Sequence, residues 1–180
     1  VEFERDAEEL KGFAKSVTDK QRKIANWWSD GLGTYTPPGH WNRRTKEYII
    51  KYEMNPLRTA RTFAYLNMAI MDAGIACWDA KYYYHFPRPI QTINGFKTII
   101  GTPNFPSYTS GHSAFSGAAA EVVAYIFPAE AQVARDWALE AAESRIYAGI
   151  HYRFDSEVGI EQGIKVAQYT LARAKADGAD

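Results

Sequence analysis

The spacing of apolar residues along this chain is mainly helical. Between residues 56 and 84, apolar or small side chains recur every three or four positions and fall on one face of a helix. These positions are Phe63, Leu66, Ile70, Gly74, Cys77 and Trp78. Asn55 is a good N-cap, and Pro56 suits the first helical position. Pro87 and Pro89 cannot continue a helix, so the pattern predicts one long helix that ends before them.

Comparable start and stop signals predict five more helices. Residues 18–21 (TDKQ) have the form of a capping box, and their helix is expected to end near Asp30, before a long turn with the sequence GLGTYTPPG. The other four are expected at about Arg43–Glu53, His112–Ile126, Pro128–Tyr147 and Asp155–Ala174. His40, in PPGHW, is predicted to be a loop residue. We find no strand-like alternation and no internal repeat, and we expect an all-α helical bundle, one domain over residues 1–180.

Charge and cysteine content exclude several classes of function. Lys and Arg number 21 and Asp and Glu also number 21, so no net charge favours nucleic acid or an anionic membrane. An anion site must therefore be a local cluster of positive charge. The single cysteine, Cys77, excludes an internal disulfide framework and a zinc site built from cysteines. No apolar run reaches the roughly 18 residues that a transmembrane helix needs, and no signal peptide is visible.

Two cations flank the predicted end of the long helix, in KYYYHFPRP. Lys81 lies on the last turn of the helix, and Arg88 follows within a turn that prolines make stiff. Such a pair is suited to bind an anion from two directions. A solvated surface pair would explain the same residues.

The stretch FPSYTSGHSAFSGAAA places a polar loop before an Ala-rich helix. The start of a helix carries unpaired N–H groups and the positive end of the helix dipole, which together bind anions. Ser110 supplies a hydroxyl, Gly111 permits close backbone approach, and His112 is placed to exchange a proton. An ordinary capped helix with a histidine in its first turn fits this stretch equally well.

The third cluster is SRIYAGIHYRFD, between the last two predicted helices. Arg145 and His151 are placed to converge on one point, and Asp155 lies four residues after His151. A carboxylate at that spacing holds one ring nitrogen and makes the other a better nucleophile or metal ligand. The alternative is a structural histidine beside a surface ion pair.

Taken together, the three clusters fit a tetrahedral oxyanion such as phosphate or vanadate. Three cations offset its charge, a hydroxyl and an amide donate to its oxygens, and two histidines and a carboxylate remain for the chemistry. The cations are Lys81, Arg88 and Arg145.

The order K-x6-RP, SGH, SR-x5-H-x3-D resembles the superfamily of type 2 phosphatidic acid phosphatases, bacterial class A acid phosphatases and vanadium-dependent haloperoxidases. The matching core spans about residues 78–155. The resemblance implies an α-helical bundle with the site at one end. Thr109 stands where the family usually has proline, which is expected to loosen the turn but removes no ligand.

Further residues resemble the haloperoxidase branch. Trp78 and Phe105 are placed as the aromatic lining of a halide pocket in that branch, and FPSYTSGH is close to its form FPxYPSGH. The segment NWWSDGLGTYTPPGHWN is similar to one that carries an aspartate supporting the SGH histidine, which would pair Asp30 with His112. The residues themselves also allow Trp78 and Phe105 to be core aromatics and Asp30 to be a turn residue.

The resemblance implies two chemistries on one set of residues. In a haloperoxidase, His151 would ligate the vanadium of vanadate with Asp155 orienting it, and His112 with Asp30 would move protons while hydrogen peroxide oxidises halide. In a phosphomonoesterase, which needs no cofactor, His151 would form a phosphohistidine and His112 would protonate the leaving oxygen. In both, five groups would bind the oxyanion: Lys81, Arg88, Ser110, Gly111 and Arg145. A third possibility is a non-catalytic domain that binds an oxyanion.

Partners and location follow from the resemblance alone. The substrates would be small molecules, either hydrogen peroxide with halide or a phosphomonoester. An exported protein, periplasmic or secreted, is the family-based expectation, and a homo-oligomer is possible. Haloperoxidases of this family are usually much longer, so the chain is expected to correspond to their catalytic half.

Overall fold

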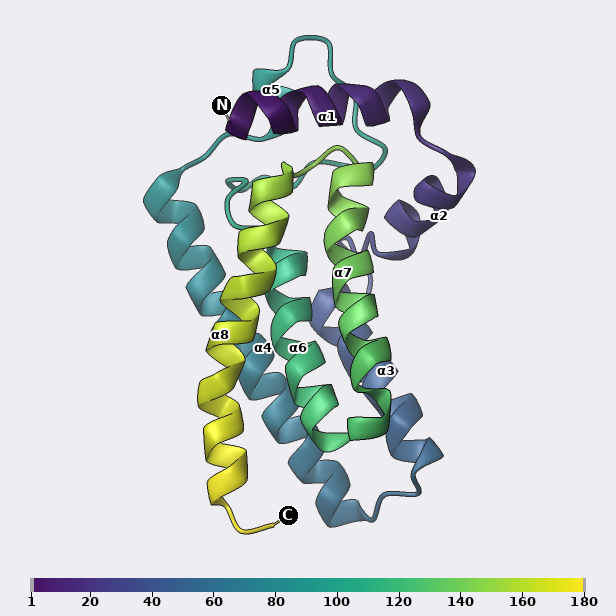
Figure 1. Ribbon diagram of the computed structural model, residues 1–180, viewed down its shortest axis with the longest axis vertical. Helices are drawn as coiled ribbons and strands as arrows, with labels where there is room; N and C mark the ends of the chain where they lie inside the picture. Colours follow the sequence, from purple (N-terminus) through teal and green to yellow (C-terminus); the bar gives the residue numbers. More distant parts are fainter. Residues whose placement is uncertain (1, 180) are drawn as a thin grey trace.

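The chain folds into a bundle of helices, and in the computed structural model residues 2–179 are described (Figure 1). Every regular element assigned among those residues is helical. The elements are α1 (Glu2–Ser16), α2 (Asp19–Trp27), α3 (Thr36–Lys51), α4 (Pro56–Tyr84), α5 (Pro89–Thr92), α6 (Gly111–Ile126), the 3₁₀ turn η1 (Pro128–Glu130), α7 (Ala131–Tyr147) and α8 (Arg153–Ala176). The predicted all-α class is confirmed.

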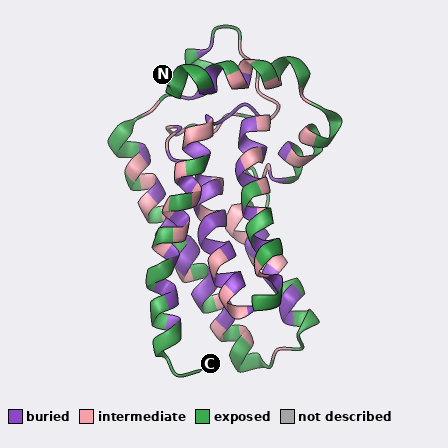
Figure 2. Cartoon of the chain, viewed as in Figure 1, coloured by how far each residue is buried: buried purple, intermediate pink, exposed green. Residues whose placement is uncertain are grey.

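Helix α6 forms the centre of the bundle. Its sequence, GHSAFSGAAAEVVAYI, is rich in small side chains, and α4, α7 and α8 pack around it. Figure 2 shows α6 as the most completely buried of the long helices. Small side chains let neighbouring backbones approach closely, so the helices around α6 can pack near its backbone. Larger side chains such as Leu66, Trp41 and Val122 complete the core.

The tightest packing joins α6 to α8. A Cβ atom added at Gly163 would lie 2.1 Å from the carbonyl oxygen of Ala114, and one at Gly159 would lie 2.8 Å from that of Ser110. At the same end, the Ser110 N–H donates to the Asp155 carbonyl at 2.9 Å. The first turns of α6 and α8 are therefore held side by side.

Most predicted helices are confirmed. The long helix runs from Pro56 to Tyr84, and the Asn55 side chain accepts from the Arg58 N–H, as expected of an N-cap. The capping box at Thr18 forms with Gln21. Ser110 caps α6, which ends at Ile126 as predicted.

The second predicted helix begins earlier than expected, and this corrects the prediction for His40. Helix α3 starts at Thr36, so Pro37 and Pro38 lie in its first turn instead of in a loop. Proline is tolerated there because the first N–H groups of a helix have no partner inside it. His40 is consequently a helical residue, and it is only 1% exposed.

Helix α1 was not predicted, and it lies across the end of the bundle where α4 and α7 end and α6 and α8 begin (Figure 1). The Asp6 carboxylate accepts the N–H of Phe154 at 2.8 Å. Glu9 pairs with Arg153 at 2.7 Å, and Arg153 also binds Glu143. The helix is thus attached to the start of α8 by polar contacts.

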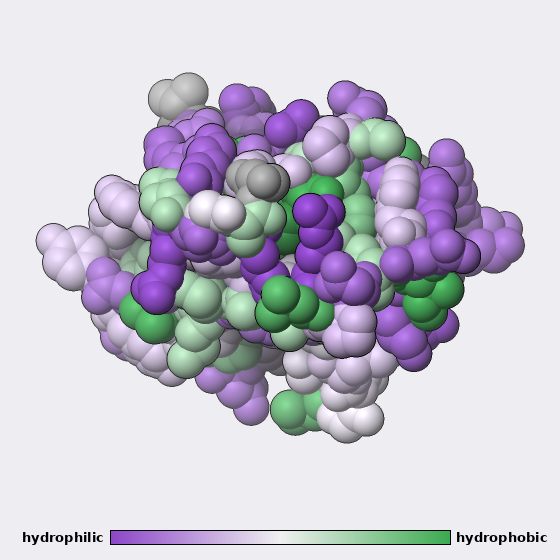
Figure 3. All heavy atoms as spheres, turned by 90° about the horizontal axis from the view of Figure 1, so that it is seen from below, coloured by the Kyte–Doolittle hydropathy of each residue, from purple (hydrophilic) through white to green (hydrophobic). Residues whose placement is uncertain are grey.

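The outer surface is mixed in character. Seen from the end opposite α1, hydrophilic and hydrophobic residues alternate in small patches (Figure 3). Among residues 2–179, no helix combines the length and apolar character needed to cross a membrane.

We expect Gly163→Ala to destabilise the fold by about 1–3 kcal/mol, because the new methyl group must displace the α6 backbone at Ala114. The matched control is Gly12→Ala on α1, where a Cβ would meet nothing within 4 Å. That change should stabilise the chain by about 0.5–1 kcal/mol. Urea denaturation measures both, and equal effects of the two substitutions would contradict the close α6–α8 contact.

Candidate active site

The three sequence clusters meet at the end of the bundle beneath α1. Lys81 comes from the last turn of α4, Ser110 and His112 from the start of α6, and Arg145 from the last turns of α7. His151 lies in the short connection between α7 and α8. Helix ends with different directions thus bring side chains from distant parts of the sequence together.

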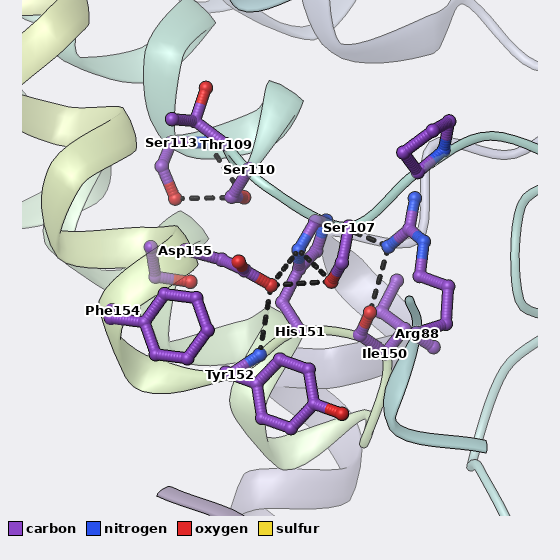
Figure 4. Close-up of polar contacts among 12 residues, drawn as sticks. Arg88, Ser107, Thr109, Ser110, Ser113, Ile150, His151, Tyr152, Phe154 and Asp155 are labelled. Atoms are coloured by element: carbon purple, nitrogen blue, oxygen red, sulfur yellow. Dashed lines mark hydrogen bonds and ion pairs between the residues drawn. The ribbon is translucent and has the colours of Figure 1, made fainter. Parts of the chain in front are cut away.

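His151 is held in one orientation by its neighbours (Figure 4). Its Nδ1 lies 2.9 Å from Oδ2 of Asp155, and its Nε2 lies 2.9 Å from Nη1 of Arg88. A carboxylate accepts and a guanidinium only donates, so Nδ1 carries the proton and Nε2 presents its lone pair. This is the tautomer that a nucleophilic or ligating Nε2 requires.

Asp155 is itself fixed by two donors. The Tyr152 N–H donates to Oδ2 at 3.1 Å, and the Ser107 hydroxyl donates to the same oxygen (Figure 4). Burial raises the pKa of Asp155 to about 6, against the lowering effect of Ser107 and the Tyr152 N–H. The carboxylate therefore depends on these donors to remain charged near neutral pH.

Arg88 has donor capacity left for an anion. Its Nε donates to the Phe105 carbonyl at 2.9 Å and its Nη1 to the Ile150 carbonyl at 2.7 Å. Its Nη2 is buried and has no partner among the described residues. Burial lowers the pKa of Arg88 to about 10. A buried guanidinium nitrogen without an acceptor is costly, and an oxyanion beside His151 would satisfy it.

Lys81 is buried and fully engaged. Its ammonium group donates to the carbonyls of Pro106, Ser107 and Thr109. Burial lowers its pKa to about 8. Because an ammonium group has three protons, Lys81 must release one carbonyl before it donates to an oxyanion.

Arg145 carries buried positive charge close to both histidines. Its guanidinium donates to Ser144 and to the carbonyls of Ala25 and Trp28, at the end of α2. Burial lowers its pKa to about 9, while the charge of Asp30 opposes that shift. The structure thus shows a second task for this residue, which is to hold α2 against α7.

The start of α6 supplies the predicted helix-end donors. Ser110 is the N-cap, and its hydroxyl oxygen accepts the N–H of Ser113. The N–H groups of the next residues, Gly111 and His112, belong to the first turn and have no intrahelical acceptor. A Cβ at Gly111 would lie 3.3 Å from the Trp78 ring, so a larger residue would press on that ring.

Trp78 and Phe105 lie together beside the cations. Their ring centroids are 5.1 Å apart. Lys81 Nζ lies 5.7 Å from the Trp78 ring centre and 5.2 Å from that of Phe105. The Arg88 guanidinium is 5.1 Å from the Phe105 ring. The two aromatics predicted for a halide pocket therefore form one wall next to the positive charges.

The predicted contact between Asp30 and His112 is present at ion-pair distance, but it is not a hydrogen bond. Asp30 Oδ2 lies 3.8 Å from Nε2 of His112, which is beyond hydrogen-bond distance. The carboxylate instead contacts Nδ1 of His40 at 3.0 Å. His40 competes for the carboxylate because helix α3 turns its ring inward, a placement that the loop prediction did not allow.

Comparison with known proteins places these residues in a family. Residues 62–177 match the sequence profile of the PAP2 superfamily. The chain belongs to the PAP2 superfamily. The three sequence motifs, from Lys81 to Asp155, all fall within the matched residues.

Relatives of this PAP2 chain include two kinds of enzyme. It is 29% identical to vanadium chloroperoxidase of Curvularia inaequalis over 127 residues, which cover 54% of this chain and 21% of that protein. It is 31% identical to non-specific acid phosphatase of Salmonella typhi over 118 residues, covering 62% of this chain and 46% of that protein. The chain therefore spans less than half the length of each of these relatives.

Solved structures show the same fold. A bacterial vanadium-dependent iodoperoxidase superposes with a TM-score of 0.87 and 30% identity, covering 95% of this chain and 49% of that one. Aquifex aeolicus LpxE superposes with a TM-score of 0.70 and 18% identity, covering 92% and 93%. The second likeness concerns the fold alone.

Two residues that sequence reasoning missed contact the candidate site residues of this PAP2 chain. Ser107 is buried and donates to Asp155; its position inside FPSYTSGH was the available signal. His40 lies one residue before Trp41, inside the segment that resembles haloperoxidases, so a signal existed for it too. Thr109, expected to loosen its turn, is buried and donates to Gln162 at 2.6 Å.

The residues of this PAP2 site fit an oxyanion held by one imidazole and by positive charge. Among residues 2–179, no group of three or more His, Cys, Asp or Glu side chains is arranged to hold a metal ion. Arg88 Nη2 and the first-turn N–H groups of α6 offer donors, and His151 offers the one lone pair of Nε2, which here accepts from Arg88 Nη1 and must leave that donor to engage an oxyanion. The predicted ligand His151 and the predicted oxyanion-binding residues thus remain candidates.

Burial lowers the pKa of His112 well below its ordinary value of 6.5, with Arg145 contributing further and the Trp28 carbonyl opposing. As pH falls below 6.5, the unfolded chain therefore binds a proton that the folded chain does not. This contribution to stability is present above pH 6.5 and is lost as pH falls toward the folded-state pKa.

We expect His112→Asn to reduce the slope of unfolding free energy against pH by up to about 1.4 kcal/mol per pH unit below pH 6.5. Urea denaturation between about pH 5 and 7 measures the slope. The exposed His85, changed to Asn, is the control for loss of an imidazole. Equal slopes for the native chain and His112→Asn would show that His112 is not buried in its neutral form.

Proposed function

We propose that this chain carries a vanadate-dependent haloperoxidase-type activity, in which hydrogen peroxide oxidises halide. The observation that supports it most is the aromatic wall of Trp78 and Phe105 beside Lys81 and Arg88. Such a wall lets a weakly hydrated anion lie next to positive charge without direct water contact. The likeness to the iodoperoxidase, at 30% identity over nearly the whole chain, supports the same choice.

Vanadate, when bound, would supply a Lewis-acidic centre that activates hydrogen peroxide. The lone pair of His151 Nε2 would hold it in place of the present contact with Arg88 Nη1, since Asp155 keeps the proton on Nδ1. Arg88 Nη2 and the Gly111 N–H would donate to its oxygens, with Ser110, Lys81 and Arg145 completing the set. Once they contact the anion, these groups would offset its negative charge.

The second histidine would handle protons. Burial keeps His112 neutral at ordinary pH, so it can accept a proton from an incoming group and return it. Asp30 would stabilise the charged ring if the 3.8 Å between Oδ2 and Nε2 shortens as the site fills. Halide would approach along the Trp78 and Phe105 wall.

A phosphomonoesterase is the second candidate, favoured by the 31% identity to the acid phosphatase. His151 Nε2 would attack phosphorus to form a phosphohistidine while His112, in its protonated form, gives a proton to the departing oxygen; the negative charge of the bound phosphate would favour that form, which burial alone disfavours. Water would then attack phosphorus, with His112 accepting its proton, to release phosphate and restore His151. The same cations serve both reactions because vanadate and the transferring phosphoryl group share shape and charge.

Paired assays on one preparation test the choice. One assay measures bromide- and iodide-dependent halogenation of a dye by hydrogen peroxide, with and without vanadate. The other measures hydrolysis of an aryl phosphate, with and without vanadate. We expect halogenation that requires vanadate. Aryl phosphate hydrolysis that vanadate inhibits, with no halogenation, would assign the phosphatase instead. No activity in either assay would favour a non-catalytic oxyanion-binding domain.

His151→Asn should lower whichever activity is found by at least about 1,000-fold, because the reacting nitrogen is lost. The matched control is His85→Asn, on the exposed C-cap of α4, where asparagine tolerates the left-handed backbone. A residual activity of His151→Asn close to that of the control would remove His151 from the proposed role.

A further inference from the structure

A second histidine shares the carboxylate that faces His112. Asp30 lies between α2 and α3, and its side chain is 3% exposed. Its two oxygens lie 3.0 and 3.2 Å from Nδ1 of His40, whereas Oδ2 lies 3.8 Å from Nε2 of His112. Asp30 thus contacts both histidines, with Oδ2 nearer to His40 than to His112.

His40 is locked in place by aromatic rings. Its ring stacks on Trp28 with centroids 4.3 Å apart, and it makes edge contacts with Trp27 at 5.2 Å and with Tyr35 at 5.4 Å. The residue is 1% exposed. These contacts hold the plane of the ring, and within that plane Nδ1 points at Asp30 and donates a hydrogen bond to the carboxylate.

Packing alone does not account for a histidine at this position. Its Nε2 is buried with no partner among the described residues, which is a cost that phenylalanine or leucine would avoid in the same aromatic surroundings. What histidine offers in return is the hydrogen bond from Nδ1 to Asp30. Asp30 in turn needs a donor, because its carboxylate lies in a closed space and its left-handed backbone, at φ 43°, fixes where that carboxylate points.

We propose that His40 is a positioning residue of the active site: it orients the Asp30 carboxylate, and through that carboxylate it sets the ring of His112. Asp30 cannot rotate away while His40 holds both oxygens, so one of them stays directed at Nε2 of His112. When His112 takes up a proton during turnover, that oxygen needs only the shift that closes the 3.8 Å gap to accept a hydrogen bond from Nε2. The assignment rests on the proposed function only in giving His112 a proton-transfer role, which both candidate reactions share.

Three substitutions separate positioning from simple packing. His40→Leu removes the donor and keeps an apolar side chain. His40→Asn keeps an N–H near the position of Nδ1 and loses the rest of the ring. Asp30→Asn removes the carboxylate charge and is combined with His40→Leu in a double-mutant cycle.

We expect His40→Leu to lower kcat by about 10- to 100-fold with little change in KM, as for loss of a group that orients a functional side chain. His40→Asn should restore most of the rate. In the Asp30→Asn background, His40→Leu should cost less than about twofold, because the group it acts through is gone. Equal rates for His40→Leu and the native chain would overturn the proposal. So would a double variant whose loss of rate equals the product of the losses in His40→Leu and Asp30→Asn.

A spectroscopic measurement keeps this test independent of the activity. The ¹H–¹⁵N spectrum of the histidine rings, assigned with His112→Asn, reports the tautomer and environment of His112 in the complete chain. We expect the His112 signals to shift in His40→Leu and to return toward their native positions in His40→Asn. Unchanged His112 signals would refute the proposal even in a chain without turnover, whereas a shift without turnover would fault only the proposed function. Should His40→Leu fail to fold, His40→Phe, which also lacks a donor, takes its place in every comparison.

Discussion

The close contact between α6 and α8 is the constraint on which the site depends. Glycine at positions 159 and 163 lets the two backbones approach so closely that a methyl group would collide with the α6 carbonyls. The hydrogen bond from Ser110 to the Asp155 carbonyl then sets the two helix starts level. Since the SGH motif begins one helix and His151 immediately precedes the other, this packing places both histidines at the same end of the bundle.

The second requirement is to keep three cations buried without an anion. Each is supported by backbone carbonyls, with Lys81 bound to the loop before α6, Arg88 to the chain on either side of the site, and Arg145 to the end of α2. Burial lowers the pKa of all three, so the site holds them charged at a cost that an oxyanion would reduce. The carbonyls thus stabilise the buried charges and also define which donors, such as Arg88 Nη2, remain for a ligand.

Helix α2 connects the core to the chemistry. Trp28, which follows it, stacks on His40, its indole nitrogen binds Glu140, and its carbonyl accepts from Arg145. Helix α2 therefore joins the aromatic core, Asp30 and α7 in one unit. Small shifts in core packing would be transmitted to the distance between Asp30 and His112, which at 3.8 Å is longer than a hydrogen bond.

The sequence by itself determined the helical class, the α4, α6, α7 and α8 boundaries to within a few residues, and the identity of the three motifs. Those features depend on local signals, namely apolar spacing, caps and prolines, and on short residue patterns. Helix α1 was missed, and the start of α3 was misplaced because its two prolines suit a turn and a first helical turn alike. Local preference cannot choose between those two conformations.

Only the tertiary structure decided which side chains share a partner. Asp30 is closer to His40 than to His112, Ser107 reaches Asp155, and the Lys81 ammonium is occupied by loop carbonyls. Each of these contacts joins residues from different helices or loops, and a difference of about 1 Å separates a hydrogen bond from none. The relative placement of helices fixes such distances through packing of the whole core, which no single stretch of sequence contains.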